Sequence, residues 1–554
     1  MKLIQNYFEF VKNNKKYYVI ILYLIAISSI VGLVYTLMLK VIIDDVLVNS
    51  EFYILPIIVT IMVLSFIINT IINYCNGVFV INIMQNISIQ LKQKIVDHIQ
   101  KMRMNKITDY ESGDLINRTK NDIDIIAQFL STAILTLITN LSNLLLYSII
   151  MFYISKKLAI FAMLFGGLQL FISQKFSNNI KKISRKQKEK ESQNLDFLAH
   201  LYKNIKFYKA FNKYNYNNNK FLNIIINLRG LAFDNFKIKY FFTSSISFIT
   251  YFASIILIGI GIYEISKGRM TIGILFVFDS INEKFYQYSN SIMNFNIEFQ
   301  NAYVSMERVN EILSLETENY DSSQQDKEVI RSKINTISIR KARFKYTDKD
   351  VIHNVNFEFN KNQAYMIMGP SGQGKTTLVN LILKLYELQG GYIDIGGVNI
   401  KDISVNEIRK KITYVMQENV ILNDSIRENL LIGDNDVSEE VLEKICKICH
   451  IEDFVQNLEK GYETVIGEKG IQLSEGQKQR ISLARGLLRE SDIYIFDEIT
   501  SHLDNELGVD IVKNIQEYRR DKIKIYITHN SSIKEYMDEI IILNDATIQK
   551  CGSF

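Results

Sequence analysis

Long apolar stretches alternate with polar, lysine-rich stretches through the first half of the chain. Six of the apolar stretches are long enough, at roughly 20 residues each, to cross a bilayer as helices. We place them at Tyr17–Ile42, Tyr53–Ile83, Ser131–Ile154, Leu158–Ile172, Phe241–Ile262 and Thr271–Met293. The fourth is short and the sixth is polar in its middle. Residues 1–16 set Phe8, Phe10 and Val11 between lysines, which predicts an amphipathic helix at the membrane interface.

The loops between these stretches predict their orientation. Residues 86–129 and 174–240 are long, basic and helical in their spacing, whereas the other connections are short. Basic loops remain on the cytoplasmic side, so we expect both chain ends in the cytoplasm of a bacterium and the spans in its cytoplasmic (inner or plasma) membrane. Charge supports the division, because residues 1–320 hold 33 Lys+Arg against 22 Asp+Glu whereas the remainder is mildly acidic. A soluble protein with buried helices does not fit this pattern.

The sixth stretch carries ionisable residues in its middle. Asp279, Glu283 and Gln287 recur every four residues and share one helix face, with Lys284 beside it. Charged groups facing lipid are costly, so we expect this face to line a wet cavity or to pair internally. The four residues are a candidate substrate cavity, and a structural Glu283–Lys284 contact between helices is the alternative.

The second half contains a phosphate-binding motif. An apolar strand starting at Tyr365 leads into Gly369–Thr376, which has the G-x-x-x-x-G-K-[ST] spacing, and an apolar helix follows. Glycines let backbone N–H groups curve around phosphate oxygens, and the helix N-terminus adds a positive dipole end. Lys375 would reach the β- and γ-phosphates of a nucleotide, and Thr376 would bind Mg²⁺. The predicted nucleotide-binding residues of this loop are Gly369, Pro370, Ser371, Gly372, Gln373, Gly374, Lys375, Thr376 and Thr377.

A second apolar strand, Ile493–Asp497, ends in two carboxylates, Asp497 and Glu498. Such a pair beside a phosphate loop would organise the metal through Asp497 and polarise the attacking water through Glu498.

With these motifs the chain resembles the ATP-binding cassette (ABC) family, and within it the exporter-type half-transporter. Five further matches occur in the family's order. They are Tyr346 for the aromatic that stacks on adenine, Gln417 for the loop glutamine, Leu473-Ser474-Glu475-Gly476-Gln477 for the signature, Ser501 to Asp504 for the dimer-contacting loop, and His529 for the switch histidine. Residues 464–470 resemble an exporter-specific loop before the signature. The membrane half matches more weakly, at 113–115 with Arg118 and Asp122, at 209–211 and at 305–309.

The resemblance implies a fold and a machine. The expected fold is a six-span α-helical membrane domain (type I exporter, or type IV ABC fold) followed by an α/β P-loop NTPase domain with an α-helical subdomain. We place the membrane domain at 17–315, a linker at 316–334 and the cassette at 335–554. ATP and Mg²⁺ are the expected cofactors, with Thr376 and Gln417 as metal ligands and Glu498, His529 and Gln417 as catalytic residues. The signature of one chain would act on the ATP of a partner chain, and the intact catalytic residues favour a homodimer over a heterodimer.

Three residues depart from the family pattern. Glu475 replaces a glycine in the signature and adds negative charge near the phosphates, Met416 stands where proline is frequent, and His502 stands where alanine is usual. They bear on the rate of hydrolysis and remove no catalytic group. Cys446 and Cys449 beside His450 have no second ligand pair at zinc-site spacing, so we expect reduced thiols on a helix.

These features together predict an ATP-driven exporter. The polar and aromatic face of the sixth stretch favours an amphiphilic, peptide-like substrate. The alternatives are a multidrug or lipid exporter or flippase, an importer on the same fold, and an ATP-gated channel or sensor. The sequence shows no nucleic-acid motif, and the basic loops are explained by topology, so the expected partners are the bilayer, the substrate and a second copy of the chain.

Overall fold

The structure, a computed structural model, describes residues 2–110, 112–318, 333–347, 349–370, 372–432, 437–467 and 470–551. It divides into two compact units: Met1–Asp97 with Glu111–Ser314, and His98–Tyr110 with Leu315–Phe554. The short segment 98–110, which includes helix α4 (Met104–Ile107), thus groups with the second unit although it interrupts the first in sequence. Most of the predicted linker, from 319 to 332, lies outside the described residues.

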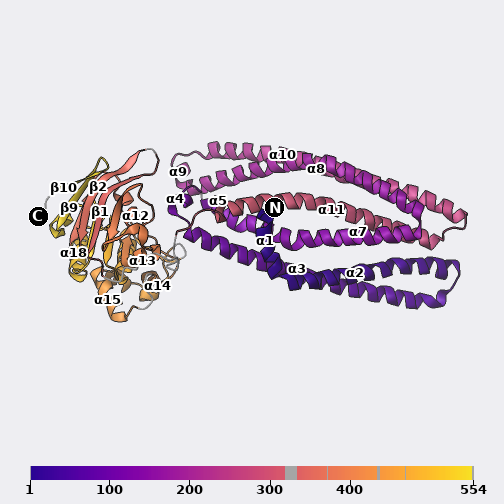
Figure 1. Ribbon diagram of the computed structural model, residues 1–554, viewed down its shortest axis with the longest axis horizontal. Coiled ribbons are helices and arrows are strands. Elements are labelled where there is room, and N and C mark those ends of the chain that lie inside the picture. Colours follow the sequence, from indigo (N-terminus) through magenta and orange to yellow (C-terminus); the bar gives the residue numbers. More distant parts are fainter. Residues whose placement is uncertain are drawn as a thin grey trace. The chain divides into compact units, whose positions relative to one another are not determined.

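Long helices form the first unit (Figure 1). They are α2 (Lys15–Val41), α3 (Leu55–Lys101), α7 (Ile134–Ile154), α8 (Lys156–Lys203), α10 (Tyr214–Ser266) and α11 (Ile272–Leu313). Each contains all or most of one of the six predicted stretches. Among the described residues, four helical segments are long and apolar enough to cross a membrane, and they contain α2, α3, α7 and α10. The helices α8 and α11 hold the short fourth stretch and the polar sixth stretch, and their crossing of the membrane stays a prediction.

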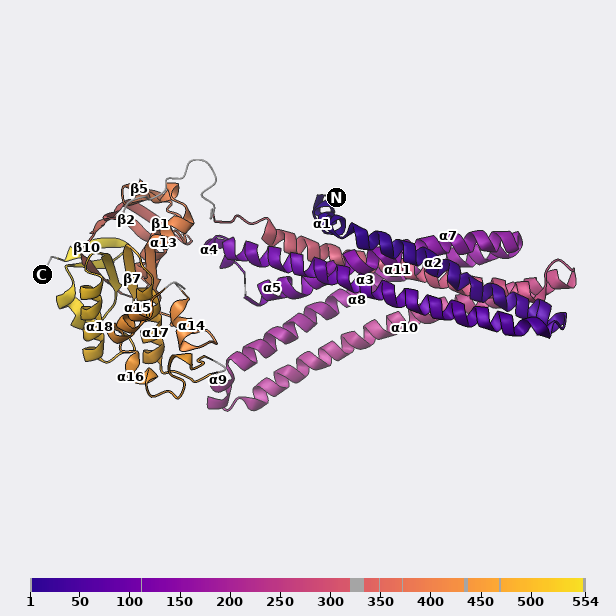
Figure 2. The ribbon, with the colours of Figure 1, turned by 90° about the horizontal axis from the view of Figure 1, so that it is seen from below.

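Pairing between these helices is extensive inside the unit. Helices α8 and α10 run side by side, as do α7 and α11 (Figures 1 and 2). Shorter pieces connect α3 to α7: α5 (Ser112–Asn117), α6 (Ile123–Gln128) and two π-helical turns, Arg118–Asp122 and Phe129–Ala133. The connection from α8 to α10 is α9 (Ile205–Ala210).

The predicted amphipathic helix is present as α1 (Lys2–Asn13). Its Tyr7 and Phe10 are buried in protein, and the Tyr7 hydroxyl donates to the carbonyl oxygen of Met306 in α11 (3.3 Å). Phe8 is exposed. The aromatic face of α1 therefore packs on α11, and only part of the helix surface is available to lipid headgroups.

The second unit contains two sheets. A four-stranded antiparallel sheet has the order β2-β1-β4-β5, and a six-stranded sheet has the order β10-β9-β3-β8-β7-β6. The strands are β1 (Thr336–Lys345), β2 (Asp350–Asn360), β3 (Ala364–Met368), β4 (Gly390–Ile395), β5 (Val398–Asn399), β6 (Ile412–Val415), β7 (Ile493–Asp497), β8 (Ile523–Ile527), β9 (Glu539–Asn544) and β10 (Thr547–Cys551). In the larger sheet β9, β3, β8, β7 and β6 are parallel, and β10 closes one edge as an antiparallel strand.

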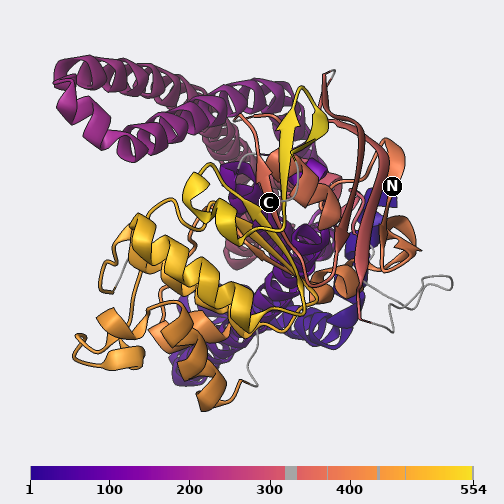
Figure 3. The ribbon, with the colours of Figure 1, turned by 90° about the vertical axis from the view of Figure 1, so that its left-hand side faces the viewer.

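Alternate side chains of the larger sheet enter two different cores. Ile367, Ile495 and Ile525 pack toward the small sheet, whereas Met366 and Phe496 pack against helices. Burial on both faces explains why these strands read as continuous apolar runs. The helices are α12 (Lys375–Ile382), α13 (Val405–Lys411), α14 (Ile426–Leu431), α15 (Glu439–Ile448), α16 (Glu452–Val455), α17 (Glu475–Leu488) and α18 (Asn505–Tyr518). Figure 2 shows the small sheet and α14–α16 on opposite sides of the larger sheet, and Figure 3 shows this unit from its strand-rich end.

Candidate functional site

The predicted nucleotide-binding residues converge at one edge of the larger sheet. The phosphate loop follows β3, Asp497 ends β7 with Glu498 directly after it, His529 follows β8 and Gln417 follows β6. Because β3, β8, β7 and β6 are parallel neighbours, their carboxyl ends lie together. The topology therefore assembles one site from four motifs that are far apart in the sequence.

Glycines give the phosphate loop its shape. Gly369, Gly372 and Gly374 have φ angles of 150°, 79° and 96°, a region that residues with a Cβ rarely adopt. A Cβ on Gly369 would also overlap the carbonyl oxygen of Leu543. Gly374 is the N-cap of α12, so the first N–H groups of that helix are available to an anion. Ser371, predicted in the same loop, lies outside the described residues.

Lys375 turns back into the loop that precedes it. Its side chain is largely buried, and Nζ donates to the carbonyl oxygens of Gly369 (2.6 Å) and Pro370 (3.0 Å). Nζ also lies 3.2 Å from Nε2 of His529. Burial lowers the pKa of Lys375. A phosphate in the loop would offer this ammonium a stronger, charged acceptor than the two carbonyl groups. At the other side of the loop, Gln373 accepts a hydrogen bond from the N–H of Asp545 (3.0 Å).

Two carboxylates face this region from the end of β7. Asp497 is 4% exposed, and Glu498 lies with Oε1 3.9 Å from Nε2 of His529. Burial raises the pKa of Asp497, and burial also raises the pKa of Glu498 against the opposing effect of His529. A carboxylate held beside an imidazole at the mouth of the phosphate loop is suited to orient a water molecule for attack on a phosphorus atom.

The residues predicted to hold Mg²⁺ offer suitable oxygen donors. Thr376 is exposed on the first turn of α12, and Gln417 is exposed after β6. Asp497 is fixed by Tyr414, whose hydroxyl donates to its Oδ2 (2.9 Å). Hydroxyl, amide and carboxylate oxygens are the ligands that Mg²⁺ prefers, and it usually takes one or two protein groups plus substrate phosphates. These residues fit the expected ion.

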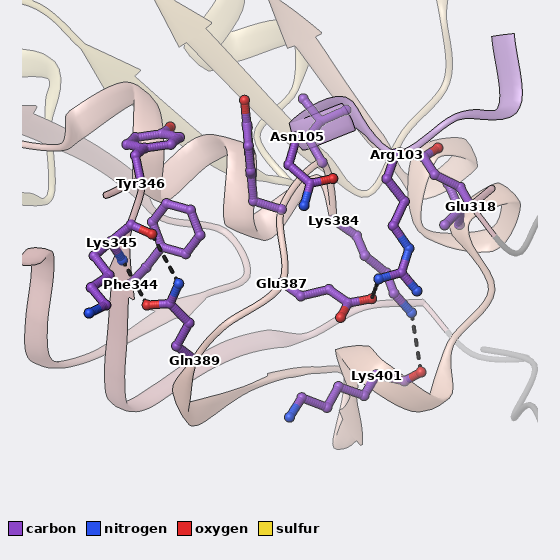
Figure 4. Close-up of a pocket in the computed structure, with 13 residues that line it drawn as sticks. Arg103, Asn105, Glu318, Phe344, Lys345, Tyr346, Lys384, Glu387, Gln389 and Lys401 are labelled. Carbon is purple, nitrogen blue, oxygen red and sulfur yellow. Dashed lines mark hydrogen bonds and ion pairs between the residues drawn. The ribbon is translucent and has the colours of Figure 1, made fainter. Parts of the chain in front are cut away.

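The aromatic predicted to stack on adenine stands beside a cavity of about 480 Å³ (Figure 4). Tyr346 is half exposed, its ring is met edge-on by Phe344 and Tyr386, and its hydroxyl is 3.3 Å from Oγ1 of Thr377. An exposed ring face held by two other rings is a suitable platform for a purine.

The segment 98–110 contributes to the wall of the same cavity. Arg103 and Asn105 line it, and Arg103 pairs with Glu316 (3.3 Å) and Glu387 (3.5 Å). Glu318, also in the wall, forms a bidentate ion pair with Arg409 (2.7 and 2.9 Å). The sequence motifs predict no residue of this segment in the nucleotide site.

The signature residues form the start of α17. Ser474 is its N-cap and makes a capping box with Gln477, each side chain bonding to the backbone of the other. The carboxylate of Glu475 pairs with Nζ of Lys478 (2.8 Å), and this neighbour lowers the pKa of Glu475. The charge that Glu475 adds to the signature is therefore partly balanced on the same helix turn. Leu473 is buried.

The predicted dimer loop is anchored to the signature helix by Gln479, a residue that the sequence motifs do not predict. Ser501 and Asp504 are exposed. Gln479, on α17, donates through Nε2 to the carbonyl oxygen of Glu498 (2.8 Å) and to Oγ of Ser501 (3.3 Å), and its Oε1 accepts from the N–H of His502 (3.2 Å). A polar residue at a core-facing position of an amphipathic helix is the signal that could have identified it.

The candidate cavity residues of α11 divide into two groups. Glu283 and Gln287 are exposed on the single chain, and Nε2 of Gln287 donates to Oε1 of Glu283 (3.3 Å). Asp279 is half buried. Lys284 points instead into the helix bundle, where Nζ bonds to the carbonyl oxygen of Gly32 and to Thr36, at 3.4 Å each. Glu283 and Gln287 are thus accessible for a substrate and Asp279 is partly accessible. Lys284 instead contributes hydrogen bonds between helices.

Two weak motifs of the membrane half form one polar network. Arg118 donates to Oδ2 of Asp114 (2.8 Å), to the carbonyl oxygen of Arg308 (2.7 Å) and to Oε2 of Glu311 (2.7 Å). Arg308 in turn pairs with Asp114 (2.6 Å) and Asp122 (3.1 Å). The helical turns 112–122 are therefore fastened to the end of α11 by charged hydrogen bonds.

The cysteine pair of α15 is a packing feature. Cys446 and Cys449 are free and fully buried, and burial raises the pKa of both thiols, that of Cys446 to about 11. His450 pairs with Asp453 and Asp510. Within the described residues no group of three or more His, Cys, Asp or Glu side chains could hold a metal ion.

Comparisons with known proteins agree with this geometry. The family model for the ABC transporter transmembrane region matches residues 18–287, and the family model described as ABC transporter matches residues 352–501. Relatives include the ATP-dependent lipid A-core flippase of Desulfotalea psychrophila, 28% identical over 93% of this chain and 90% of that protein. Another is the "Putative export ATP-binding/permease protein" of Rickettsia bellii, 30% identical over 88% and 85%. A third is the "Putative multidrug export ATP-binding/permease protein YgaD" of Bacillus subtilis, 26% identical over 100% and 96%.

A solved structure shows the same fold. The structure of a bacterial Atm1-family ABC exporter with ATP bound has a TM-score of 0.86 with this chain, covers 97% of it and 95% of that chain, and is 19% identical in sequence. The predicted fold class, a helical exporter membrane domain followed by a P-loop NTPase domain, is confirmed.

Proposed function

The chain belongs to the ATP-binding cassette transporter family, and we propose that two copies of it form an exporter for an amphiphilic, lipid-like or drug-like molecule. Its enzymatic activity is ATP hydrolysis coupled to transport. The observation that carries the proposal is the convergence of the phosphate loop, Asp497, Glu498 and His529. The same chain carries, among its described residues, four helical segments long and apolar enough to cross a membrane, and it has a polar stripe on α11.

The hydrolytic step follows from the site residues. Lys375 would exchange its carbonyl partners for phosphate oxygens, and the N–H groups of α12 would hold the same phosphates. Glu498 and His529, 3.9 Å apart, would hold the attacking water in line. Mg²⁺ bound with ATP at Thr376, Gln417 and Asp497 would neutralise charge that develops on the phosphate oxygens.

A second chain completes the site in this proposal. The chain carries one phosphate loop and one signature. Ser474 caps an exposed helix N-terminus, which can donate hydrogen bonds to the phosphate of a nucleotide held on another cassette. Because Glu498 and His529 are both present, two identical chains would form two competent sites, and we propose a homodimer.

The cargo is inferred from the exposed polar face of α11 and from the relatives. Glu283 and Gln287 are exposed on a helix that is otherwise rich in apolar residues, and a charged group is costly against lipid. This face is suited to the polar end of an amphiphile. The relatives described above are named as a lipid flippase and as an export and a multidrug export protein, so we propose a cargo of that kind in place of the peptide-like cargo that the sequence alone favoured. We propose further that both chain ends lie in the cytoplasm.

Reconstitution tests the proposal. Purified protein in liposomes should hydrolyse ATP and move a headgroup-labelled lipid or an amphiphilic dye, and Glu498→Gln should lower the ATPase rate by about 100-fold or more. Movement from the cassette-bearing side indicates export and the reverse direction indicates import. ATPase activity without movement of lipid, dye or peptide would favour the gating alternative, and undiminished activity in Glu498→Gln would refute the catalytic assignment.

A further inference from the structure

A buried glutamine links the signature helix to the catalytic glutamate within one cassette. Gln479 is 2% exposed, and its amide makes the three hydrogen bonds described above, to Glu498, Ser501 and His502. Without these bonds, buried donors and acceptors would be unpaired both on Gln479 and on the loop, which costs free energy. The three bonds therefore hold the Gln479 amide in one orientation. All three bonds go to the loop between β7 and α18, residues 498–504.

The backbone of Glu498 needs such support. Its φ angle is +52°, in the left-handed region that non-glycine residues adopt only where surrounding contacts hold them. Its N–H donates to the carbonyl oxygen of Ile527 (2.8 Å), and its carbonyl oxygen accepts from Ser501 N–H (3.1 Å) and from Gln479. The Gln479 amide is the contact in this set that comes from a helix and not from the β7–β8 edge or its loop. It therefore couples the conformation of Glu498 to the position of α17.

The start of α17 packs closely on the same loop. A Cβ on Gly476 would lie 2.8 Å from the carbonyl oxygen of His502, so the signature backbone and the loop are in contact. The signature at the N-terminus of α17 and Gln479 lie within two helical turns of each other. A displacement of the signature therefore reaches Glu498 through one rigid helix end.

We propose that Gln479 is a positioning residue for Glu498 and that it carries information between the two ATP sites of the dimer. This role rests on the proposed dimer. In that dimer the signature of each chain binds the partner's ATP, whereas Glu498 of the same chain acts on the ATP bound to its own phosphate loop. Gln479 then lets Glu498 take its working position when the signature beside it is engaged on the partner's nucleotide. Hydrolysis at one site thereby depends on occupancy of the other.

Mixed dimers separate this role from a purely local one. Two differently tagged full-length chains are co-purified, so that each dimer has one hydrolysing site. In the first dimer, chain one carries Gln479→Leu and chain two carries Glu498→Gln; the active glutamate lies beside the altered residue. In the second dimer, chain one carries both Gln479→Leu and Glu498→Gln, and chain two is unaltered; only the signature used by the active site is on the altered chain.

The proposal expects an unequal result. In the first dimer kcat for ATP hydrolysis should fall by about 10- to 100-fold, the cost of a displaced catalytic group, and KM for ATP should change little. In the second dimer kcat should fall by less than about threefold. In the dimer of two unaltered chains the Hill coefficient for ATP should exceed that of the dimer in which both chains carry Gln479→Leu. Equal losses in the two mixed dimers, or a larger loss in the second, would overturn the positioning role, and an unchanged Hill coefficient would overturn the communication between sites.

Two further variants guard against a simple folding defect. Gln479→Glu keeps an acceptor for His502 N–H but replaces the donor to Glu498, so it should reproduce the loss in the first dimer. Gln516→Leu changes a partly buried glutamine of α18 outside the site and should leave kcat unchanged. Failure of the proposed dimer shows itself differently, because tagged chains would then not co-purify or the unaltered protein would hydrolyse no ATP.

Discussion

Replacing Arg118 by methionine should destabilise the membrane unit far more than removal of an exposed ion pair in the same unit. The Arg118 side chain is 9% exposed and contacts Asp114 (2.8 Å) and Glu311 (2.7 Å), which are 33% and 54% exposed. Breaking a fully buried ion pair costs about 3–5 kcal/mol. Because both carboxylates retain some water, we expect a loss of about 2–3 kcal/mol in the free energy of unfolding. The matched control is Lys92→Met, which removes a 2.8 Å pair with Asp124 that is 39% and 53% exposed, and should cost less than about 1 kcal/mol.

Thermal unfolding of the purified protein in detergent measures the difference. At about 2–4 °C per kcal/mol, Arg118→Met should lower the midpoint by about 4–12 °C and Lys92→Met by less than about 4 °C. The double variant Arg118→Met with Glu311→Gln should lose less than the sum of the two single variants, since they share a contact. Equal shifts for Arg118→Met and Lys92→Met would show that burial of the network contributes nothing and would refute the reasoning.

Three further predictions concern the ATP site. In the proposed mechanism Glu498 acts as a carboxylate, and burial raises its pKa. The ATPase rate should therefore be full above that raised pKa and fall as the pH drops through it, at a pH higher than the ordinary glutamate value of about 4.3. A pH profile of kcat that stays flat to that value would contradict the assignment. Tyr414→Phe removes the 2.9 Å hydrogen bond to Asp497. The Mg²⁺ concentration for half-maximal ATPase activity should rise by about fivefold, which corresponds to about 1 kcal/mol of binding free energy, and the thermal midpoint should change little. Glu475→Gly removes a negative charge and its ion pair with Lys478 from a helix end that faces phosphate in the proposed dimer. The variant should lower KM for ATP by about two- to fivefold. A raised KM would show that the carboxylate assists binding.

Local spacing predicts the phosphate loop and the Asp497–Glu498 pair, whereas Gln417 and His529 are predicted only from the resemblance to the ABC family. The phosphate loop, the Asp497–Glu498 pair and the residues Gln417 and His529 each follow a short apolar strand. Parallel strands buried on both faces place their carboxyl ends at one edge, which explains why these residues meet. The observed strand order places the four strands that precede them side by side.

Contacts between distant segments were not predictable in the same way. Arg118 and Arg308 meet across 190 residues, and nothing in the spacing of either motif specifies the other. Lys284 follows Glu283 on the same helix, but its Nζ donates hydrogen bonds to Gly32 and Thr36, because its long side chain reaches acceptors inside the bundle. Gln479 looked like one more polar residue of a helix, since its three partners become adjacent only when the loop after β7 folds back on α17.

Each unit, considered by itself, leaves polar groups on a surface that a second copy of the chain would complete. On α11, Glu283 and Gln287 are exposed in a segment that the pattern places in the membrane, where lipid cannot satisfy a carboxylate. On α17, Ser474 presents a capped but exposed helix N-terminus beside a balanced carboxylate, where an anion is favoured. In the proposed homodimer the first surface would face a wet cavity and the second a nucleotide phosphate, and both would gain polar partners. One assembly thus accounts for two independent features, and for that reason the mixed dimers with Gln479→Leu test the dimer and the communication between its sites in the same experiment.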